Sequence, residues 1–591
     1  MSDITPEEFS SKPFDYLIVG GGTAGLVLAA RLSENPSIRV GVLEAGRAQF
    51  DNPKVNIPGL LGRSVADPEL DWTYMTTPQK ELGGRQLLYS RGKMLGGSSG
   101  LNFMFWGRGT RGTMSGRRTL GKYSNKSQTL NIPTGPEQLA MLPTPTHVPE
   151  FHGTDGPIHV SFSSWYEDVN KFLMPAFADI GVPRNVEPMG GCPVGSNIAA
   201  LSIGPATGTR SYSANAYYRP NSSRENLVVL TGAQTTKVLI EDFVAVGVEY
   251  LFDGKAHSAH CSQEVILSAG AIASPQLLEL SGIGDRKLLE KYGIECKVEN
   301  PNVGEGMQDH LLTGIEFELR PGTSTMNDLG DPQKLAEAMK EYEASFSGIL
   351  ATLHTHYAMI PLSKVMPQSE VEHIKQTIKK DLETTTSPRD RLIYQIELNR
   401  LNSSQDSLGQ VEIISAPFGL QVFRTEEEDI PGKQHFSFFM IGMHPHSHGS
   451  VHISSQNVTD QPTINPAVYS SNVDRHVLLR ATQLADEMAK RPPFENFLGK
   501  RIQPPEGEMM TESDWDKFVG ESTQTCCHSI ATCAMLPRDK GGVVDEKLRV
   551  YGVKGLRVVD ASILPVHISH HIQATVYAVA EQAADLIKEE W

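Results

Sequence analysis

Three glycines near the N-terminus have the spacing of a nucleotide-binding turn. Gly20, Gly22 and Gly25 stand in GxGxxG register and enclose Thr23 and Ala24. In such a turn the first glycine permits a tight bend, the second lets the backbone approach a pyrophosphate, and the third lets helix and strand pack closely. Backbone N–H groups at the start of the helix then face the phosphates. The pattern therefore predicts a dinucleotide site.

The elements expected around these glycines form one βαβ unit. A strand is expected at Asp15 to Val19, a helix at Ala24 to Glu34 and a second strand at Arg39 to Leu43. Glu44 ends the second strand, is followed by Ala45, and can accept hydrogen bonds from a ribose. This unit predicts a bound dinucleotide but does not distinguish FAD from NAD.

Two longer stretches combine glycine turns with polar side chains at fixed positions. The first runs from Gly92 to Asn102 and continues into an aromatic loop, Phe103 to Trp106; the second runs from Gly270 to Gly284. Small residues in the first stretch let backbone N–H groups approach a cofactor. Both stretches resemble the two signatures of the glucose-methanol-choline (GMC) oxidoreductases and occur in the same order. The resemblance covers most of the chain and implies FAD as the cofactor.

The resemblance also assigns individual residues to the cofactor. They are Leu95, Ser98, Asn102, Thr235, Asp560, Ala561 and Ile572. Relatives with covalently bound flavin have a histidine two residues before the arginine that opens the first signature, where this chain has Tyr89. We therefore expect non-covalent FAD. Trp72 and Tyr74 either wall the flavin or pack elsewhere.

Two histidines near the C-terminus are the candidate catalytic residues. By resemblance, His528 begins the family's histidine-led motif and His571, 43 residues later, is its second active-site position. Alcohol oxidation removes a hydride from carbon and a proton from oxygen, and histidine, with a pKa ordinarily near about 6.5, suits the base. We expect His528 to be the base and His571 its hydrogen-bonding partner; the reverse stays open because paired imidazoles titrate together. A helix expected from Gln573 to Glu589 would point its positive end at the flavin.

At 591 residues the chain is long enough for two domains. The expected fold is mixed α/β and α+β. A Rossmann-like FAD-binding domain is expected at 14–110, 226–310 and 526–591. A discontinuous substrate-binding domain, built on an antiparallel sheet with helices, is expected at 311–525, with a lid and substrate-domain segment at 111–225.

Further expected elements are strands Leu227 to Leu230, Lys237 to Ile240, Val265 to Leu267 and Arg557 to Asp560, and helices Pro275 to Ser281 and Asp474 to Lys490.

The net charge and the composition of the chain limit the kinds of molecule that it can bind. The formal charge of −16 disfavours nucleic acid, and no apolar run approaches the ~20 residues that cross a bilayer. The acidic start, Met1 to Lys12, lacks the features of a secretory signal, so we expect a cytoplasmic protein without a membrane partner. The six cysteines show no zinc-type spacing and are expected to be structural.

Most other histidines are expected to be satisfied polar groups. They are His152, His310, His354, His567 and His570. His444, His446 and His448 alternate as metal ligands could, yet nearby prolines and the lack of a cysteine or carboxylate partner favour a loop. No metal is expected.

One segment departs from the GMC pattern. Relatives have an aromatic, proline-containing lid where this chain has polar, basic residues from Gly109 to Leu130. Such a segment is expected to bury little apolar surface and to be disordered. An altered lid or a misplaced gene boundary would explain it, and either would weaken FAD retention.

The leading functional hypothesis is oxidation of a small-molecule alcohol to an aldehyde or ketone, with electrons passing through FAD to oxygen or another acceptor. The alternatives are a non-redox cyclase or lyase on the same scaffold, and an FAD-binding protein with a defective lid. The aromatic loop Phe103 to Trp106 favours an aryl or secondary-metabolite alcohol. The sequence leaves the substrate, the choice between oxidase and dehydrogenase, and the oligomeric state open.

Overall fold

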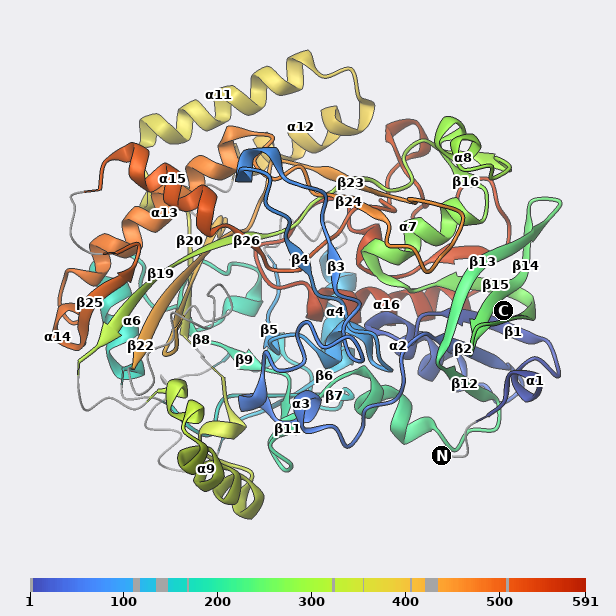
Figure 1. Cartoon of the computed structure of the whole chain (residues 1–591), viewed down its shortest axis with the longest axis horizontal. Helices are drawn as coiled ribbons and strands as arrows, with labels where there is room; N and C mark the ends of the chain where they lie inside the picture. Colours follow the sequence, from blue (N-terminus) through green and yellow to red (C-terminus); the bar gives the residue numbers. More distant parts are fainter. Residues whose placement is uncertain are drawn as a thin grey trace.

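The computed structural model describes residues 4–109, 117–133, 147–166, 169–320, 325–353, 356–403, 407–419, 434–505 and 510–590. Two seven-stranded sheets lie side by side in this part of the chain (Figure 1). Two of the sequence expectations, residues 110–116 of the lid segment and His354, fall outside the described residues. The mixed α/β fold is as expected; the division into five domain segments stays a prediction.

The first sheet is the nucleotide-binding sheet. Its strands are β1 (Phe14–Val19), β2 (Val40–Glu44), β12 (Leu227–Thr231), β13 (Ala233–Glu241), β14 (Val244–Phe252), β15 (Lys255–Leu267) and β27 (Leu556–Val558). The order is β12-β2-β1-β15-β14-β13, with β27 pairing β15. Strands β12, β2, β1, β15 and β27 pair in parallel, and β2 is buried along its whole length, as its Val-rich sequence predicts for a strand covered on both faces.

Helix α2 (Thr23–Leu32) connects β1 to β2, and α16 (Gln573–Lys588) packs against it. Strand β14 was not expected, and β15 begins ten residues earlier than predicted. Both differences come from turns at Asp242 and Asp253, where positive φ angles of 47° let the chain reverse twice. The result is an antiparallel extension of a parallel sheet.

The helix after β15 was predicted to begin at Pro275, and that boundary is wrong. Helix α7 spans Gly270–Leu280 and contains Pro275 in its interior. A proline there has no N–H for the carbonyl four residues earlier, Ala271. The Thr532 hydroxyl donates to that carbonyl at 2.7 Å instead. A contact from a distant segment thus lets the helix continue through the proline.

The second sheet is antiparallel and forms the other half of the molecule. Its strands are β8 (Gly195–Ile198), β19 (Leu311–Leu319), β20 (His356–Ile360), β21 (Val411–Ala416), β22 (His435–Gly442), β25 (Leu498–Gln503) and β26 (Gln524–Thr525). Helix α13 (Asn472–Ala489) packs on β19, β21 and β22. Helices α11 (Gln368–Thr384) and α12 (Pro388–Ser403) form an outer hairpin (Figure 1).

The expectation of a disordered lid segment is wrong for its second half. Residues Arg117–Ser127 form helix α4, which packs against α16. The Tyr123 side chain is buried there, and Asn125 accepts a 2.6 Å hydrogen bond from the buried Arg108. Polar contacts such as this one therefore help to hold the helix, and a count of apolar residues does not reveal them.

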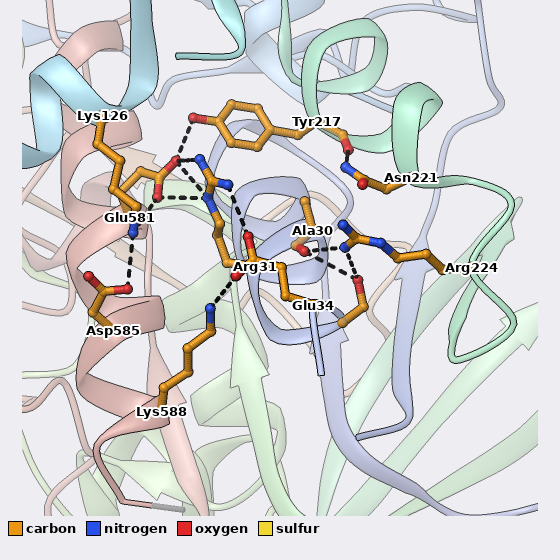
Figure 2. A network of polar contacts seen from close by, with 11 residues as sticks. Ala30, Arg31, Glu34, Lys126, Tyr217, Asn221, Arg224, Glu581, Asp585 and Lys588 are labelled. Carbon is orange, nitrogen blue, oxygen red and sulfur yellow. Dashed lines mark hydrogen bonds and ion pairs between the residues drawn. The ribbon is translucent and has the colours of Figure 1, made fainter. Parts of the chain in front are cut away.

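An ion-pair network joins α4, α16 and α2 (Figure 2). The Glu581 carboxylate is fully buried and accepts hydrogen bonds from Arg31 at 2.8–3.0 Å and from the Tyr217 hydroxyl at 2.8 Å. Lys126 of α4 lies 3.2 Å from Glu581 and 3.0 Å from Asp585. One carboxylate thus holds the nucleotide-binding helix and the divergent helix to the C-terminal helix.

We expect Glu581→Gln to lower the free energy of unfolding by about 2–3 kcal/mol, because charged donors would lose their buried partner. The matched control is Glu34→Gln, whose side chain is 40% exposed and pairs with Arg31 and Lys588. That change should cost less than about 1 kcal/mol. Urea unfolding of the holoprotein measures both, and equal effects would contradict a dominant role for Glu581.

Candidate active site

A cavity of about 690 Å³ lies between the two sheets. Its walls come from the turn after β1, the loop that follows Arg91, the inner strands of the antiparallel sheet and the N-terminus of α16. The volume is within the usual range of about 300–1,000 Å³ for ligand sites. The stretch from Gly92 to Asn102 therefore runs along a ligand-sized space.

Fourteen of the sixteen residues assigned from the sequence line this cavity. They are Gly20, Gly22, Thr23, Ala24, Glu44, Ala45, Ser98, Asn102, Thr235, His528, Asp560, Ala561, His571 and Ile572. Trp72 and Tyr74 also line it and stack on each other with ring centroids 5.7 Å apart. Gly25 and Leu95 do not line it; they support the turn from behind.

The glycine turn has the geometry that its sequence predicts. Gly20 has a φ of +99°, and a Cβ on Gly25 would lie 1.9 Å from the Gly20 carbonyl oxygen. Glu44 accepts backbone hydrogen bonds from Gly21 at 2.9 Å and Gly46 at 2.8 Å. Burial raises the pKa of the Glu44 carboxyl to about 7 although these N–H groups oppose the shift. Glu44 therefore holds the turn as well as facing the cavity.

A segment that the sequence did not point to supports both cofactor loops. The Ser213 hydroxyl donates toward the carbonyls of Gly22 at 3.2 Å and Gly96 at 3.3 Å, and the Ser213 N–H donates to Ser99. The Tyr212 ring packs against Gly96, whose φ is +103°. These residues follow β11 (Thr209–Arg210) and start a π-helix, Ala214–Tyr218. No local motif marks them, because their role depends on loops more than a hundred residues away.

The histidine ring of His528 is oriented by a second histidine. His310 Nε2 lies 3.0 Å from the Met443 carbonyl, which can only accept, so Nε2 of His310 carries the proton. Burial lowers the pKa of His310 to about 3, which leaves its Nδ1 as an acceptor. His528 Nδ1 lies 3.0 Å from that atom and must donate to it. The lone pair of neutral His528 is therefore on Nε2.

Burial also lowers the pKa of His528 well below its ordinary value, and His571 and His310 add to the shift. Its backbone N–H donates to the buried Asp309 carboxylate at 2.7 Å. No described residue forms a hydrogen bond with Nε2 of His528. The ring that lines the cavity is thus a neutral base with one uncommitted acceptor atom.

The structure brings His571 next to His528, with ring centroids 4.9 Å apart and planes at 76°. His571 Nε2 lies 3.0 Å from an oxygen of Glu412, a fully buried carboxylate on β21. The His571 ring also stacks on Phe105. Glu412 belongs to the antiparallel sheet, so the sequence around the histidines carried no sign of it. The carboxylate orients the second imidazole.

His310 was expected to be a satisfied polar group, and both of its ring nitrogens have partners, His528 Nδ1 and the Met443 carbonyl, although its contact with His528 was not predicted. The same expectation is wrong for His567, because neither ring nitrogen has a hydrogen-bond partner among the described residues. The His567 ring instead stacks on His310 with centroids 3.8 Å apart. His570 accepts the backbone N–H of His571 at 2.9 Å. These side chains are clustered because the chain after β27 returns to the loop that precedes β19.

The argument that His446 lacks carboxylate partners is also wrong. His446 lies 2.6 Å from Glu397 and 3.0 Å from Asp381, and His448 lies 3.3 Å from Asp390. The acids come from the helical hairpin α11–α12, far away in sequence. Despite burial, these acids raise the pKa of His446 to about 9. The described residues contain no group of three or more histidine, cysteine, aspartate or glutamate side chains that could hold a metal ion.

The residues present fit an FAD. A Cβ on Gly97 would lie 2.8 Å from Gly22 Cα, so only glycine lets these two phosphate-facing loops approach each other. The N-terminus of α16 contributes Ile572, Gln573 and Val576 to the cavity, and Gln573 accepts a hydrogen bond from Asn102. The N-termini of two helices, α2 and α16, thus face one cavity, which suits a ligand with negative charge at two points. Gly22, Gly97 and Glu44 would hold the dinucleotide, and Asn102 with Gln573 the flavin.

A Rossmann-like sheet, a dinucleotide cradle and a histidine pair in one cavity define a flavin-dependent oxidoreductase. Family profiles described as GMC oxidoreductase match residues 14–312 and 445–580. The chain belongs to the GMC oxidoreductase family, and FAD is its cofactor.

Individual relatives extend over the whole chain. The chain is 35% identical to dehydrogenase citC of Monascus ruber, over 100% of this chain and 98% of that protein. An FAD-dependent oxidoreductase from Chaetomium thermophilum, solved with a bound fragment, is 27% identical with a TM-score of 0.88, covering 98% of this chain and 99% of that one. The pyridoxine 4-oxidase of Mesorbium loti has a TM-score of 0.77 at 25% identity, with 98% and 99% coverage. In the described residues no helix is both long and apolar enough to cross a bilayer.

Proposed function

We propose that this protein oxidises the CH–OH group of an uncharged, apolar alcohol to the aldehyde or ketone, with His528 as the base. The observation that carries the proposal is the fixed tautomer of His528, whose Nε2 has no partner among the described residues and belongs to a ring that lines the cavity. A placed base of this kind is typically worth about 10²–10⁴-fold in rate. Bound FAD would supply the acceptor for the hydride equivalent of the carbinol carbon.

The chain's own residues handle the proton. His528 Nε2 takes the hydroxyl proton, and the resulting positive charge is shared with His310 through the Nδ1 to Nδ1 hydrogen bond at 3.0 Å. His571, held through Nε2 by Glu412, faces the same space and orients the substrate oxygen. Glu412 also compensates positive charge on the imidazole pair, because its carboxylate is fully buried.

The lining of the cavity supports an apolar substrate. The antiparallel sheet and the loop after Asn102 contribute Phe103, Phe105, Leu312, Ile414, Phe418, Phe439 and Ile441. The charged lining side chains are already hydrogen-bonded: Glu44 to backbone N–H groups, Asp560 to Ser274 and Gly270, and Arg91 to Ser529 and Cys527. A charged or polyhydroxylated substrate would lose water without gaining a partner. An aryl alcohol, including one of secondary metabolism, is the proposed class.

The attachment of FAD is proposed to be non-covalent. Position 89 is a tyrosine that is buried and paired within the short hairpin of β3 (Tyr74–Met75) and β4 (Leu88–Tyr89). Trichloroacetic acid precipitation tests this: the yellow colour should stay in the supernatant.

Anaerobic mixing of the holoenzyme with alcohols tests the reaction. We expect benzyl-type alcohols to bleach the flavin absorbance, and choline and glucose to leave it unchanged. Formation of a product at the same oxidation level as the substrate, without bleaching, would instead establish a non-redox lyase or cyclase. Neither bleaching nor product with any alcohol would establish an FAD-binding protein without turnover. Repeating the productive reaction with oxygen and with a dye acceptor distinguishes an oxidase from a dehydrogenase.

A further inference from the structure

Arg210 is a buried cation for which the described residues supply no carboxylate. The residue is 1% exposed and ends β11, directly before the segment that supports the cofactor loops. Burial lowers the pKa of its guanidinium to about 10, so it remains positively charged at neutral pH. No aspartate or glutamate of the described chain lies within ion-pairing distance of it.

Among the described residues, the guanidinium of Arg210 donates hydrogen bonds to neutral oxygens alone. Nε donates to the Val55 carbonyl at 2.8 Å. Nη1 donates to the Asn102 carbonyl at 2.6 Å, to Asn102 Oδ1 at 2.9 Å and to the Ser99 carbonyl at 3.3 Å. These bonds fix the loop that lines the cavity, and they aim the Asn102 amide at Gln573 of α16.

Carbonyl groups satisfy the donors of a guanidinium but do not neutralise its charge. A buried charge without a partner of opposite sign is strongly destabilising, so such groups persist where a counter-charge is supplied. The cavity that Asn102 and Gly22 line is the one assigned to FAD, whose pyrophosphate is anionic and whose ring gains electron density on reduction. Ser213, three residues after Arg210, contacts the backbone of both cofactor loops.

We propose that Arg210 is a positioning residue whose buried positive charge is balanced by the bound FAD. Through its hydrogen bonds to the Asn102 loop, it raises both the affinity for FAD and the midpoint potential of the flavin. The proposal rests on the cofactor of the family and not on the alcohol chemistry above. It differs from a purely structural role in one respect: removal of the positive charge should lower the melting temperature of the holoprotein more than that of the apoprotein.

The first test compares Arg210→Met with Arg210→Lys, with FAD affinity and melting temperature measured for apo and holo forms. We expect Arg210→Met to weaken FAD binding at least about tenfold, the loss expected when one charged interaction is removed from a buried site. The rise in Tm on adding FAD should shrink in parallel, by linkage. Arg210→Lys keeps the charge and should retain most of that rise.

Arg557→Met is the matched control, because Arg557 is also 1% exposed but pairs with two carboxylates, Glu264 and Glu590. It should lower the Tm of the apo and holo forms equally. The same pattern in Arg210→Met, with unchanged FAD affinity, would overturn the proposal.

The second test is the two-electron midpoint potential of the flavin, which a scaffold role would not move. Loss of the charge in Arg210→Met should lower the potential, since the electron-rich reduced ring loses a favourable field. Arg210→Lys should keep the wild-type value. If Arg210→Met does not fold, Arg210→Lys decides alone: a wild-type potential together with most of the FAD-induced rise in Tm supports the proposal, and a lowered potential overturns it.

Discussion

Replacing His528 by alanine is expected to lower kcat about 10³-fold while the protein stays yellow. The reason is that His528 Nε2 is the uncommitted acceptor of a ring that lines the cavity. The glycine turn and the Gly92 to Asn102 loop, which would hold the FAD, are left unchanged by the substitution. Stopped-flow flavin reduction measures the loss directly, and the absorbance spectrum reports the bound cofactor.

The control is His356→Gln. His356 is fully buried, and burial lowers its pKa to about 3, as burial also lowers the pKa of His528. It lies on β20, and among the described residues its side chain forms hydrogen bonds only with Ser196 and Ser415. Its replacement should leave the rate of flavin reduction within about twofold of the wild-type rate.

The low pKa of His528 also predicts that wild-type turnover stays constant from neutral into mildly acidic pH, because the base form persists below about pH 6.5. An unchanged rate of flavin reduction in His528→Ala would show that His528 is not the base.

The second large effect is expected for Glu412→Gln, with flavin reduction falling about 10²-fold. The carboxylate can only accept from His571 Nε2, whereas an amide can also donate and so permits the wrong tautomer of the imidazole. The positive charge that forms on the histidine pair would also lose its buried counter-charge. The holoprotein should fold and bind FAD normally, because Glu412 does not line the cavity.

Glu316→Gln provides the comparison. Glu316 is equally buried in the same sheet, on β19, and contacts His435. It tests whether loss of any buried carboxylate–histidine contact in this sheet slows the enzyme. Equal slowing in both variants would assign the effect to the fold, whereas slowing in Glu412→Gln alone supports orientation of His571. A deuterated-alcohol isotope effect would show whether the slowed step is C–H cleavage.

Local pattern was enough to predict several parts of this protein. The GxGxxG turn, the βαβ unit and the long C-terminal helix are encoded by neighbouring residues, and strand β1 and helix α16 differ from their predicted bounds by one residue at one end. The two GMC signatures indicated FAD, and fourteen of the sixteen assigned residues line one cavity. These features could be predicted because each depends on the conformational preferences or spacing of residues close in sequence.

Tertiary structure alone decided which groups surround those residues. Glu412 reaches His571 from a strand 159 positions earlier, and His310 reaches His528 across 218 positions. Arg210 and Ser213 support loops that precede them by more than a hundred residues. Such contacts arise when two sheets pack and bury charged or polar groups that need partners, and the partner is chosen by geometry in three dimensions rather than by sequence spacing. The tautomer of His528 and the balance of charge around the flavin therefore follow from the packed fold.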